Sequence, residues 1–353
     1  MNPRIRKVYE NLGREGLDCL IVFSSANITY LTKYTSRDSF LLVSEKENIY
    51  FTDSRYLEEA RDNLRGIAKV CKINDSLPKL LVEAACCFGF KRLGFEERHT
   101  SFFQYKKLKQ EVPISAELVP TLDLIEKIRQ VKEAQEVEKI KQAVKITASA
   151  LKFIEGFILS GKREIEIAGE IERFIRYNGA SKCSFDTIVA SGPNSSFPHH
   201  ISSTRKLRDN EVVLIDIGVD YMGYKSDLTR IFFLGKIKIL TRKIYDIVLK
   251  AQELALRKIR PGVSTRTIDA YSRQYITKAG YGACFGHNLG HGVGLQVHEG
   301  PSISVKDGEL LLPGMVFTVE PAIYLAHKFG IRIEDMVLVT KKGCEVLSGA
   351  VHK

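Results

Sequence analysis

The sequence of 353 residues contains no apolar run that approaches the ~20 residues needed to cross a bilayer. This absence argues against a membrane-spanning helix and predicts no membrane partner. A secretory leader is not expected either, because the short apolar run Cys19–Phe23 follows an acidic and polar stretch. We therefore expect the protein to reside in the cytoplasm.

Cysteine pairs and blocks of like charge are also missing. The seven cysteines, an odd number, form no C-x-x-C pair, which argues against a disulfide framework and against a thiolate zinc site. The net charge of +11 would suit a nucleic-acid partner. However, the basic residues alternate with acidic ones, as in Arg129–Gln142. Such alternation is typical of a solvated helix face, so we predict no nucleic-acid partner.

The length and the apolar pattern predict two domains. Up to about residue 125, short apolar runs alternate with amphipathic stretches, which indicates an α/β domain. A long helical stretch from about Lys132 to Phe157 follows, and we place the domains at 1–125 and 126–353. The second domain combines long helices with hairpin strands and has no regular βαβ alternation, which predicts an α+β fold.

Carboxylates interrupt two apolar strands of the second domain. Asp216 lies within the run Val212–Gly218, and Asp227 begins the run Asp227–Phe233. If the chain reverses at Tyr221–Met222, these carboxylates face each other on one side of a hairpin, with Cβ atoms ~4.5–5.5 Å apart. A β-bulge would shift that register. Buried carboxylates are costly unless they are paired or bind a metal, so the pair is a candidate metal site.

A second carboxylate pair and a histidine-rich segment extend this pattern. Glu320 ends one strand and Glu334 lies in another, and a glycine-rich segment between the two pairs contains His287, His291 and His298. Two divalent cations about 3.5–4 Å apart would relieve the repulsion between four such carboxylates. Oxygen and nitrogen ligands without thiolate favour manganese, cobalt, zinc or iron. The five candidate ligands are Asp216, Asp227, His291, Glu320 and Glu334.

Each of these residues, taken singly, is more often an edge, turn or loop residue than a metal ligand. The hypothesis of a two-metal site therefore depends on their joint order, spacing and flanking residues.

Four motifs carry a resemblance to a known family: IDIG…SDLTR, GHNLGHGVGLQVHEGP, TVEPAIY and GIRIED. They resemble the metallopeptidases of the pita-bread fold, which include methionine aminopeptidase, aminopeptidase P and prolidase. The N-terminal region is similar to the creatinase-like domain of the latter two. The resemblance covers essentially the whole chain and implies an α+β protein, with an α/β creatinase-like domain at 1–125 and a pita-bread catalytic domain at 126–353.

The resemblance also implies a role for each site residue. Asp216 would bind one metal, His291 and Glu320 the other, and Asp227 and Glu334 would bridge the two. Glu320 also matches the carboxylate that accepts and transfers protons. The residues that would contact substrate are His199 and His298 as hydrogen-bond donors, His287 as a further active-site histidine, Arg332 beside the metals, and Phe185 and Ile188 in the proline pocket.

Simpler roles for two of these residues stay open. His199 could be a surface loop residue, and Arg332 could be an ion-pair partner of Glu334 or Asp335.

The implied reaction is hydrolysis of the peptide bond that precedes proline, and it requires two divalent metal ions. Manganese is the metal we expect, with cobalt, zinc or iron as alternatives. We expect an Xaa-Pro aminopeptidase (aminopeptidase P) rather than an Xaa-Pro dipeptidase (prolidase). Some dipeptide-cleaving relatives have an arginine after the HE-x-P motif, suited to the substrate carboxylate, where this sequence has Ser302.

Two other readings are disfavoured because all five ligands are present. One is an inactive pita-bread binding module, and the other is metal-free, creatinase-like hydrolysis. The substrates would be peptides with proline at the second position. The resemblance also implies a homodimer.

Overall fold

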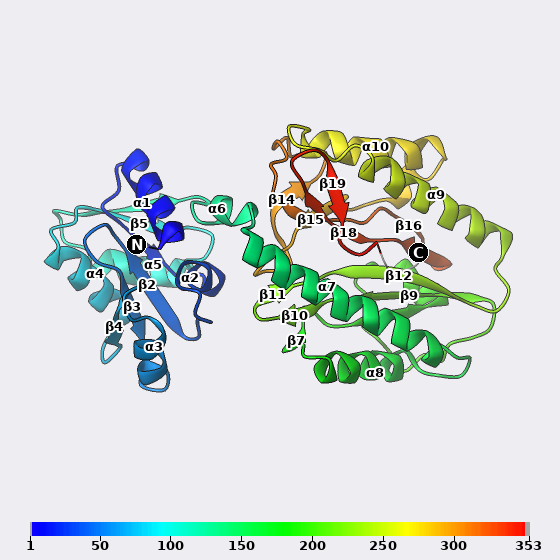
Figure 1. Ribbon diagram of the computed structural model, residues 1–353, viewed down its shortest axis with the longest axis horizontal. Coiled ribbons are helices and arrows are strands. Elements are labelled where there is room, and N and C mark those ends of the chain that lie inside the picture. Colours follow the sequence, from blue (N-terminus) through cyan, green and yellow to red (C-terminus); the bar gives the residue numbers. More distant parts are fainter. Residues whose placement is uncertain (1, 350–353) are drawn as a thin grey trace. The chain divides into compact units, whose positions relative to one another are not determined.

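The computed structural model describes residues 2–349 (Figure 1). The chain divides into two compact units, and the division along the sequence falls between Arg129 and Gln130. This division falls inside helix α6 (Glu126–Gln130), whereas we predicted the boundary at 125/126, and the domain limits stay a prediction. Within residues 2–349, no helix combines the length and the apolar character that a membrane span requires.

The first unit is an α/β layer domain around one mixed six-stranded sheet, in the order β4-β3-β2-β1-β5-β6. Strand β1 pairs antiparallel with β2 and parallel with β5, and all four of its residues are buried, which explains its continuous apolar sequence. The strands are β1 (Cys19–Val22), β2 (Ser39–Val43), β3 (Ile49–Thr52), β4 (Lys69–Lys72), β5 (Arg92–Glu96) and β6 (Glu117–Thr121). The helices are α1 (Pro3–Glu15), α2 (Ser25–Thr32), α3 (Leu57–Asn63), α4 (Leu77–Cys87) and α5 (Phe102–Glu111).

The second unit has the predicted α+β architecture, with long helices and antiparallel strands. The helices are α7 (Ala134–Ile154), α8 (Glu164–Tyr177), α9 (Ile239–Leu256) and α10 (Thr265–Lys278), with short 3₁₀ helices η1 (Glu155–Phe157), η2 (Gly192–Ser196) and η3 (Gly282–Cys284). A three-stranded sheet has the order β12-β9-β8, and a five-stranded sheet has the order β14-β13-β15-β18-β19.

Smaller sheets, in the orders β11-β10-β7 and β16-β17, complete the second unit. Its first strands are β7 (Lys182–Cys183), β8 (Ile188–Ser191), β9 (Glu211–Ile217), β10 (Val219–Tyr221), β11 (Tyr224–Lys225) and β12 (Leu228–Leu234). The later strands are β13 (Gly290–Gly292), β14 (Glu299–Ile303), β15 (Val316–Val319), β16 (Ala322–Leu325), β17 (Phe329–Arg332), β18 (Asp335–Val339) and β19 (Cys344–Val346).

Strand β9 lies between two hydrophobic cores, and its side chains alternate between them. Val212 and Leu214 pack with residues of α9 and α10, whereas Val213 and Ile215 pack with residues of α7 and α8. Figure 1 shows α7 beside α8 and α9 beside α10. A strand that is buried on both faces needs apolar residues throughout, so Asp216 at its end stands out.

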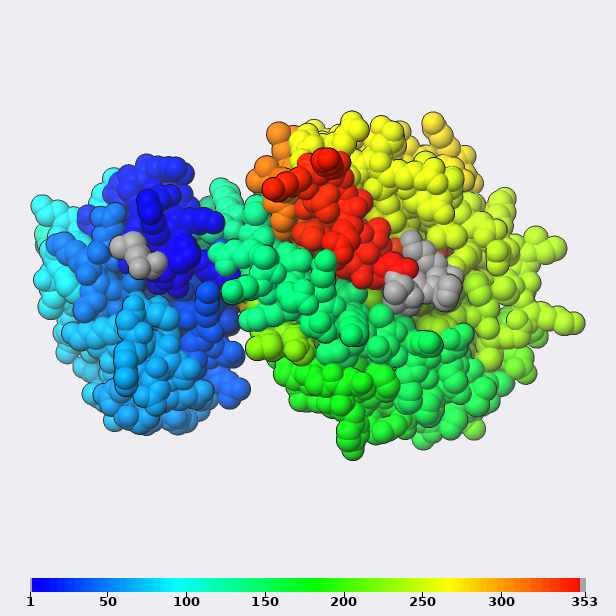
Figure 2. Space-filling model, in the orientation of Figure 1, coloured from blue at the N-terminus to red at the C-terminus, as the bar shows by residue number. Residues whose placement is uncertain are grey.

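The C-terminal strand β19 lies against the second unit's helices. Figure 2 shows this part of the chain between α7 and the helices α9 and α10. An ion pair of 2.8 Å between Lys141 of α7 and Glu345 of β19 joins the two elements on this face.

The hairpin that carries the first two carboxylates has a different register from the one predicted. The turn lies at Met222 and Gly223, whose φ angles are 50° and 87°, so Asp216 pairs with Thr229 and not with Asp227. Our prediction of two directly opposed carboxylates is therefore wrong by two positions. A two-residue turn with positive φ at both positions matches the twist of the flanking strands, and glycine adopts such a φ without strain.

Candidate metal centre

The five candidate ligands lie in or directly beside five different strands and meet in one cavity of about 460 Å³. Asp216 lies in β9, Asp227 directly precedes β12, and His291 lies in β13. Glu320 directly follows β15, and Glu334 directly precedes β18.

Three of these side chains lie close enough to hold one cation. Asp227, His291 and Glu334 each offer a ligand atom, and these atoms lie within 4.8 Å of one another. His291 Nε2 is 3.6 Å from Asp227 Oδ2 and 3.3 Å from Glu320 Oε1. The other ring nitrogen, Nδ1, lies 3.2 Å from the carbonyl oxygen of Gly292, which turns Nε2 towards the carboxylates.

Among the five candidate ligands, two buried carboxylate oxygens have no hydrogen-bond partner within the described chain, Asp216 Oδ1 and Glu334 Oε1. An unpaired buried carboxylate oxygen is energetically costly, and a bound cation removes that cost. The residues therefore fit divalent metal ions, and their oxygen and nitrogen donors fit manganese, cobalt, zinc or iron.

The charges of the cluster indicate the same need for cations. Burial and the neighbouring Glu334 and Asp216 raise the pKa of Asp227 well above its usual value. Burial and the charges of Glu320 and Asp216 likewise raise the pKa of Glu334. Burial also raises the pKa of Asp216, although Arg332 opposes this effect. Negative charge is thus in excess here, and positive charge would stabilise the ionised carboxylates.

Glu320 behaves differently from the other carboxylates. Burial alone would raise its pKa, but the hydrogen bond and the charge of His291 lower the pKa of Glu320 to about 2. The hydroxyl of Thr318 donates a hydrogen bond of 2.9 Å to Glu320 Oε1. Glu320 is therefore ionised at neutral pH, as a proton acceptor must be.

Arg332 lies beside the carboxylates, and its ion-pair partner is Asp216. Its Nη2 is 2.5 Å from Asp216 Oδ2, and its Nε donates to Thr229 Oγ1 at 2.9 Å. The Thr229 hydroxyl in turn donates to Glu334 Oε2 at 2.7 Å. Sequence reasoning missed Thr229, which could have been found only from its position opposite Asp216 in the observed register.

The predicted histidines line the same cavity. The rings of His291 and His298 are in edge contact, with centroids 4.2 Å apart. His287 Nε2 is 3.4 Å from the hydroxyl of Tyr324, which sequence reasoning missed although it lies in the TVEPAIY motif. Burial lowers the pKa of His287 and of His298, so both imidazoles are neutral at neutral pH and each can donate one hydrogen bond.

All predicted site residues lie at this one cavity. Besides the ligands, Arg332 and the histidines His199, His287 and His298, its wall includes the predicted Phe185 and Ile188. The wall also includes Ser302, which the sequence singled out, and five residues that it did not: Pro198, Asn288, Gly290, Val297 and Tyr324. The arrangement combines metal ligands, hydrogen-bond donors and an apolar wall, as expected for hydrolysis of a small, partly apolar substrate.

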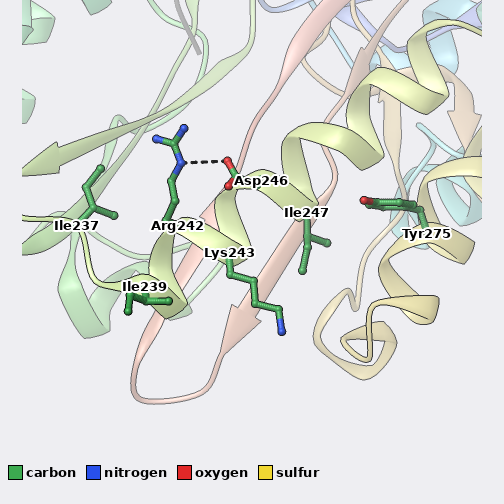
Figure 3. Close-up of a pocket in the computed structure, with 7 residues that line it drawn as sticks. All are labelled: Ile237, Ile239, Arg242, Lys243, Asp246, Ile247 and Tyr275. Atoms are coloured by element: carbon green, nitrogen blue, oxygen red, sulfur yellow. Dashed lines mark ion pairs between the residues drawn. The ribbon is translucent and has the colours of Figure 1, made fainter.

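A larger hollow of about 770 Å³ lies elsewhere on the second unit (Figure 3). It is lined by Ile237, Ile239, Arg242, Lys243, Asp246, Ile247 and Tyr275. Arg242 and Asp246 form an ion pair of 3.1 Å between side chains that are both more than half exposed, at 59% and 55%. None of these lining residues is a histidine or a cysteine, so the smaller cavity is the candidate site.

Metal ions should stabilise the folded protein. Adding manganese or cobalt to metal-stripped protein is expected to raise its Tm, because the cations bind a cluster that the unfolded chain lacks. Binding at 100 times Kd adds about 2.7 kcal/mol to the free energy of unfolding. Differential scanning fluorimetry measures the shift, and a chelator should reverse it. An unchanged Tm at millimolar metal would contradict the proposed ligand set.

Comparison with known proteins places this site in a family. Residues 138–341 match the model of metallopeptidase family M24, and residues 4–131 match the creatinase/prolidase N-terminal domain. An Xaa-Pro dipeptidase of Pyrococcus horikoshii is 34% identical over 350 residues, covering 99% of this chain and 97% of the relative.

Two solved structures are also similar over nearly the whole chain. An Xaa-Pro dipeptidase from Bacillus anthracis has a TM-score of 0.95 at 35% identity, with 99% of this chain and 98% of that chain covered. An X-Pro aminopeptidase from Thermotoga maritima has a TM-score of 0.88 at 34% identity, with 98% and 97% covered. The chain therefore belongs to metallopeptidase family M24, with a creatinase-like N-terminal domain and a pita-bread catalytic domain, and it is a metallo-exopeptidase.

Proposed function

We propose that the chain is an Xaa-Pro dipeptidase, which uses two divalent metal ions to hydrolyse the bond before proline in dipeptides. The observation that carries this proposal is the single cavity in which ligand side chains, histidines and the apolar Phe185 and Ile188 meet. Its volume of about 460 Å³ suits a small substrate. Relatives named Xaa-Pro dipeptidase favour this activity over the aminopeptidase P that Ser302 led us to expect.

The aminopeptidase remains the second candidate. One similar structure is named X-Pro aminopeptidase, and Ser302 lies in the cavity wall where an arginine would bind a substrate carboxylate. Both activities need the same metals and the same proline pocket. They differ in whether the substrate peptide may continue beyond its proline.

In the proposed site, Asp216 would hold one cation, His291 and Glu320 would hold the other, and Asp227 and Glu334 would serve both. Bound divalent cations would polarise the scissile carbonyl and supply a nucleophilic water at neutral pH. Manganese is the metal we favour, with cobalt, zinc or iron as alternatives. The rest of the chemistry falls to side chains of the chain itself.

Glu320 accepts a proton from the attacking water and delivers it to the departing nitrogen of proline. His298 and His199 donate hydrogen bonds to the substrate carbonyl as its oxygen gains charge. His287 and Arg332 hold the substrate and the carboxylates in place. Phe185 and Ile188 enclose the proline ring and exclude water from it. The family resemblance extends the proposal to a homodimer.

A matched pair of substrates tests the proposal. An Xaa-Pro dipeptide and the same dipeptide extended by two residues are assayed with metal-stripped protein, with manganese or cobalt restored, and with chelator. We expect metal-dependent cleavage of the dipeptide, and a kcat/KM for the extended peptide about 100-fold lower. Efficient release of the first residue from the extended peptide would instead establish the aminopeptidase. Cleavage of neither peptide by protein with two bound metals would contradict the proline specificity.

A further inference from the structure

Glu164, in the first turn of α8, is fully buried and does not line the active-site cavity. A buried carboxylate needs hydrogen-bond donors, and this one has them on both oxygens. Oε1 accepts from the amide nitrogen and the hydroxyl of Ser191, both at 2.7 Å, and from Asn194 at 3.0 Å. Oε2 accepts from the amide and the hydroxyl of Ser203, at 3.1 and 2.6 Å.

The same oxygen, Oε2, lies 2.9 Å from Nε2 of His200, the residue next to His199. Burial alone would raise the pKa of Glu164, but the hydrogen bonds from Ser203, Ser191 and His200 lower it. The carboxylate is therefore ionised at neutral pH, and its bonds are the stronger, charge-assisted kind.

These donors all belong to one stretch of chain, from the end of β8 through η2 to the loop of residues 197–203. That loop carries His199 into the cavity wall. Apolar packing does little to hold it, because Phe197 and Ile201 are 51% and 85% exposed. Polar contacts must therefore fix its conformation.

The loop is held from two sides. On the cavity side, Nη1 of Arg332 donates to the carbonyl oxygen of Pro198 at 3.2 Å. On the far side, Glu164 binds His200 and Ser203. His199 lies between these two attachments along the chain.

We infer that Glu164 is a positioning residue, which holds the 197–203 loop so that the His199 imidazole stays at the substrate carbonyl. This inference rests on the proposed function for its effect on catalysis. A small displacement of a hydrogen-bond donor costs on the order of 10- to 100-fold in rate.

The test compares Glu164→Gln with Glu172→Gln, a variant of an exposed glutamate on the same helix. Glutamine has nearly the same shape but places an amide donor against donors, so it cannot replace the carboxylate. We expect Glu164→Gln to lower kcat/KM for the dipeptide about 10-fold or more, mainly through kcat, with metal content unchanged. Glu172→Gln should have the same kcat/KM and metal content as the protein of natural sequence.

A double-variant cycle separates positioning from a general structural role. If Glu164 acts through His199, then Glu164→Gln should change kcat/KM by less than about 2-fold in the His199→Ala background. An equal loss in both backgrounds, loss of metal from the Glu164→Gln protein, or unchanged activity would each overturn the inference. If Glu164→Gln does not fold, Ser203→Ala, which removes one donor, takes its place in the cycle.

Hydrogen exchange on the metal-free protein gives a readout that needs no activity. Amides of residues 191–203 should exchange about 10-fold faster in Glu164→Gln, while amides of α10 stay protected. Unchanged exchange in 191–203 would overturn the inference even in an active enzyme. If the natural protein cleaves neither peptide, the proposed function fails, and exchange alone then decides whether Glu164 holds the loop.

Discussion

Replacing Asp227 by asparagine is expected to abolish metal-dependent hydrolysis, with kcat/KM reduced about 10³-fold or more. Asp227 Oδ2 lies 3.6 Å from His291 Nε2, and Asp227 shares the candidate cation site with His291 and Glu334. The amide keeps the shape but removes the negative charge that a shared cation requires. Metal content, measured by elemental analysis after dialysis, should fall with the activity.

The same substitution should not unfold the metal-free protein. Burial and the charges of Glu334 and Asp216 raise the pKa of Asp227, so ionising it in the folded state costs stability. Protonated Asp227 contributes stability that is fully present below its ordinary pKa of 3.8 and is lost as the pH rises through its raised pKa in the folded state. Metal-free Asp227→Asn should therefore be at least as stable as the natural sequence at pH 7, and its advantage should shrink near pH 4.

His298→Ala is the matched control for Asp227→Asn, because His298 lines the same cavity without being a proposed ligand. Its turnover should fall while its metal content stays at that of the natural protein. Full activity of Asp227→Asn would refute the bridging role, and loss of metal from His298→Ala would make His298 a ligand.

Replacing Arg230 by methionine is expected to lower the free energy of unfolding by about 3–5 kcal/mol. Arg230 is 2% exposed, and its Nη2 lies 2.8 Å from Oδ1 of Asp335, which is fully buried. The guanidinium also donates to the carbonyl oxygens of Thr229 and Glu334. The substitution would leave the Asp335 charge buried without its cation and would loosen the backbone that carries Glu334.

Urea unfolding of metal-free protein measures this effect. Arg242→Met is the control, because the Arg242–Asp246 pair in Figure 3 is exposed and such pairs contribute about 0–1 kcal/mol. The double variant Arg230→Met with Asp335→Leu should recover part of the loss, because it leaves no buried charge unpaired. If Arg230→Met costs no more than Arg242→Met, the buried pair does not stabilise this fold.

The residues of the candidate site could be named from the sequence alone. Asp216, Asp227, His291, Glu320 and Glu334 all line the cavity. The signal was local, because a carboxylate in or beside an apolar strand is costly to bury unless it is paired or binds a metal. The α+β class of the second unit was likewise predictable, since apolar periodicity and helix signals are local properties of the chain.

The register of the hairpin and the partner of Arg332 became known only from the folded structure. The turn at Met222 and Gly223 moved Asp216 opposite Thr229, because a two-residue turn with positive φ fits the twist of its strands better than the reversal we assumed. Arg332 pairs with Asp216 and not with its neighbours in sequence. Arg332 and Asp216 lie 116 positions apart, and no local pattern encodes such a contact.

Glu164 and Glu166 illustrate the same difference. Both lie in the first turn of α8, where either carboxylate suits the positive end of the helix dipole, so the sequence alone does not distinguish them. In the structure, Glu164 is fully buried beneath the segment 191–203, whereas the Glu166 side chain is 40% exposed and pairs with Arg163. Only the packing of that distant segment onto the helix selects which glutamate holds the His199 loop, because burial is a property of the assembled fold.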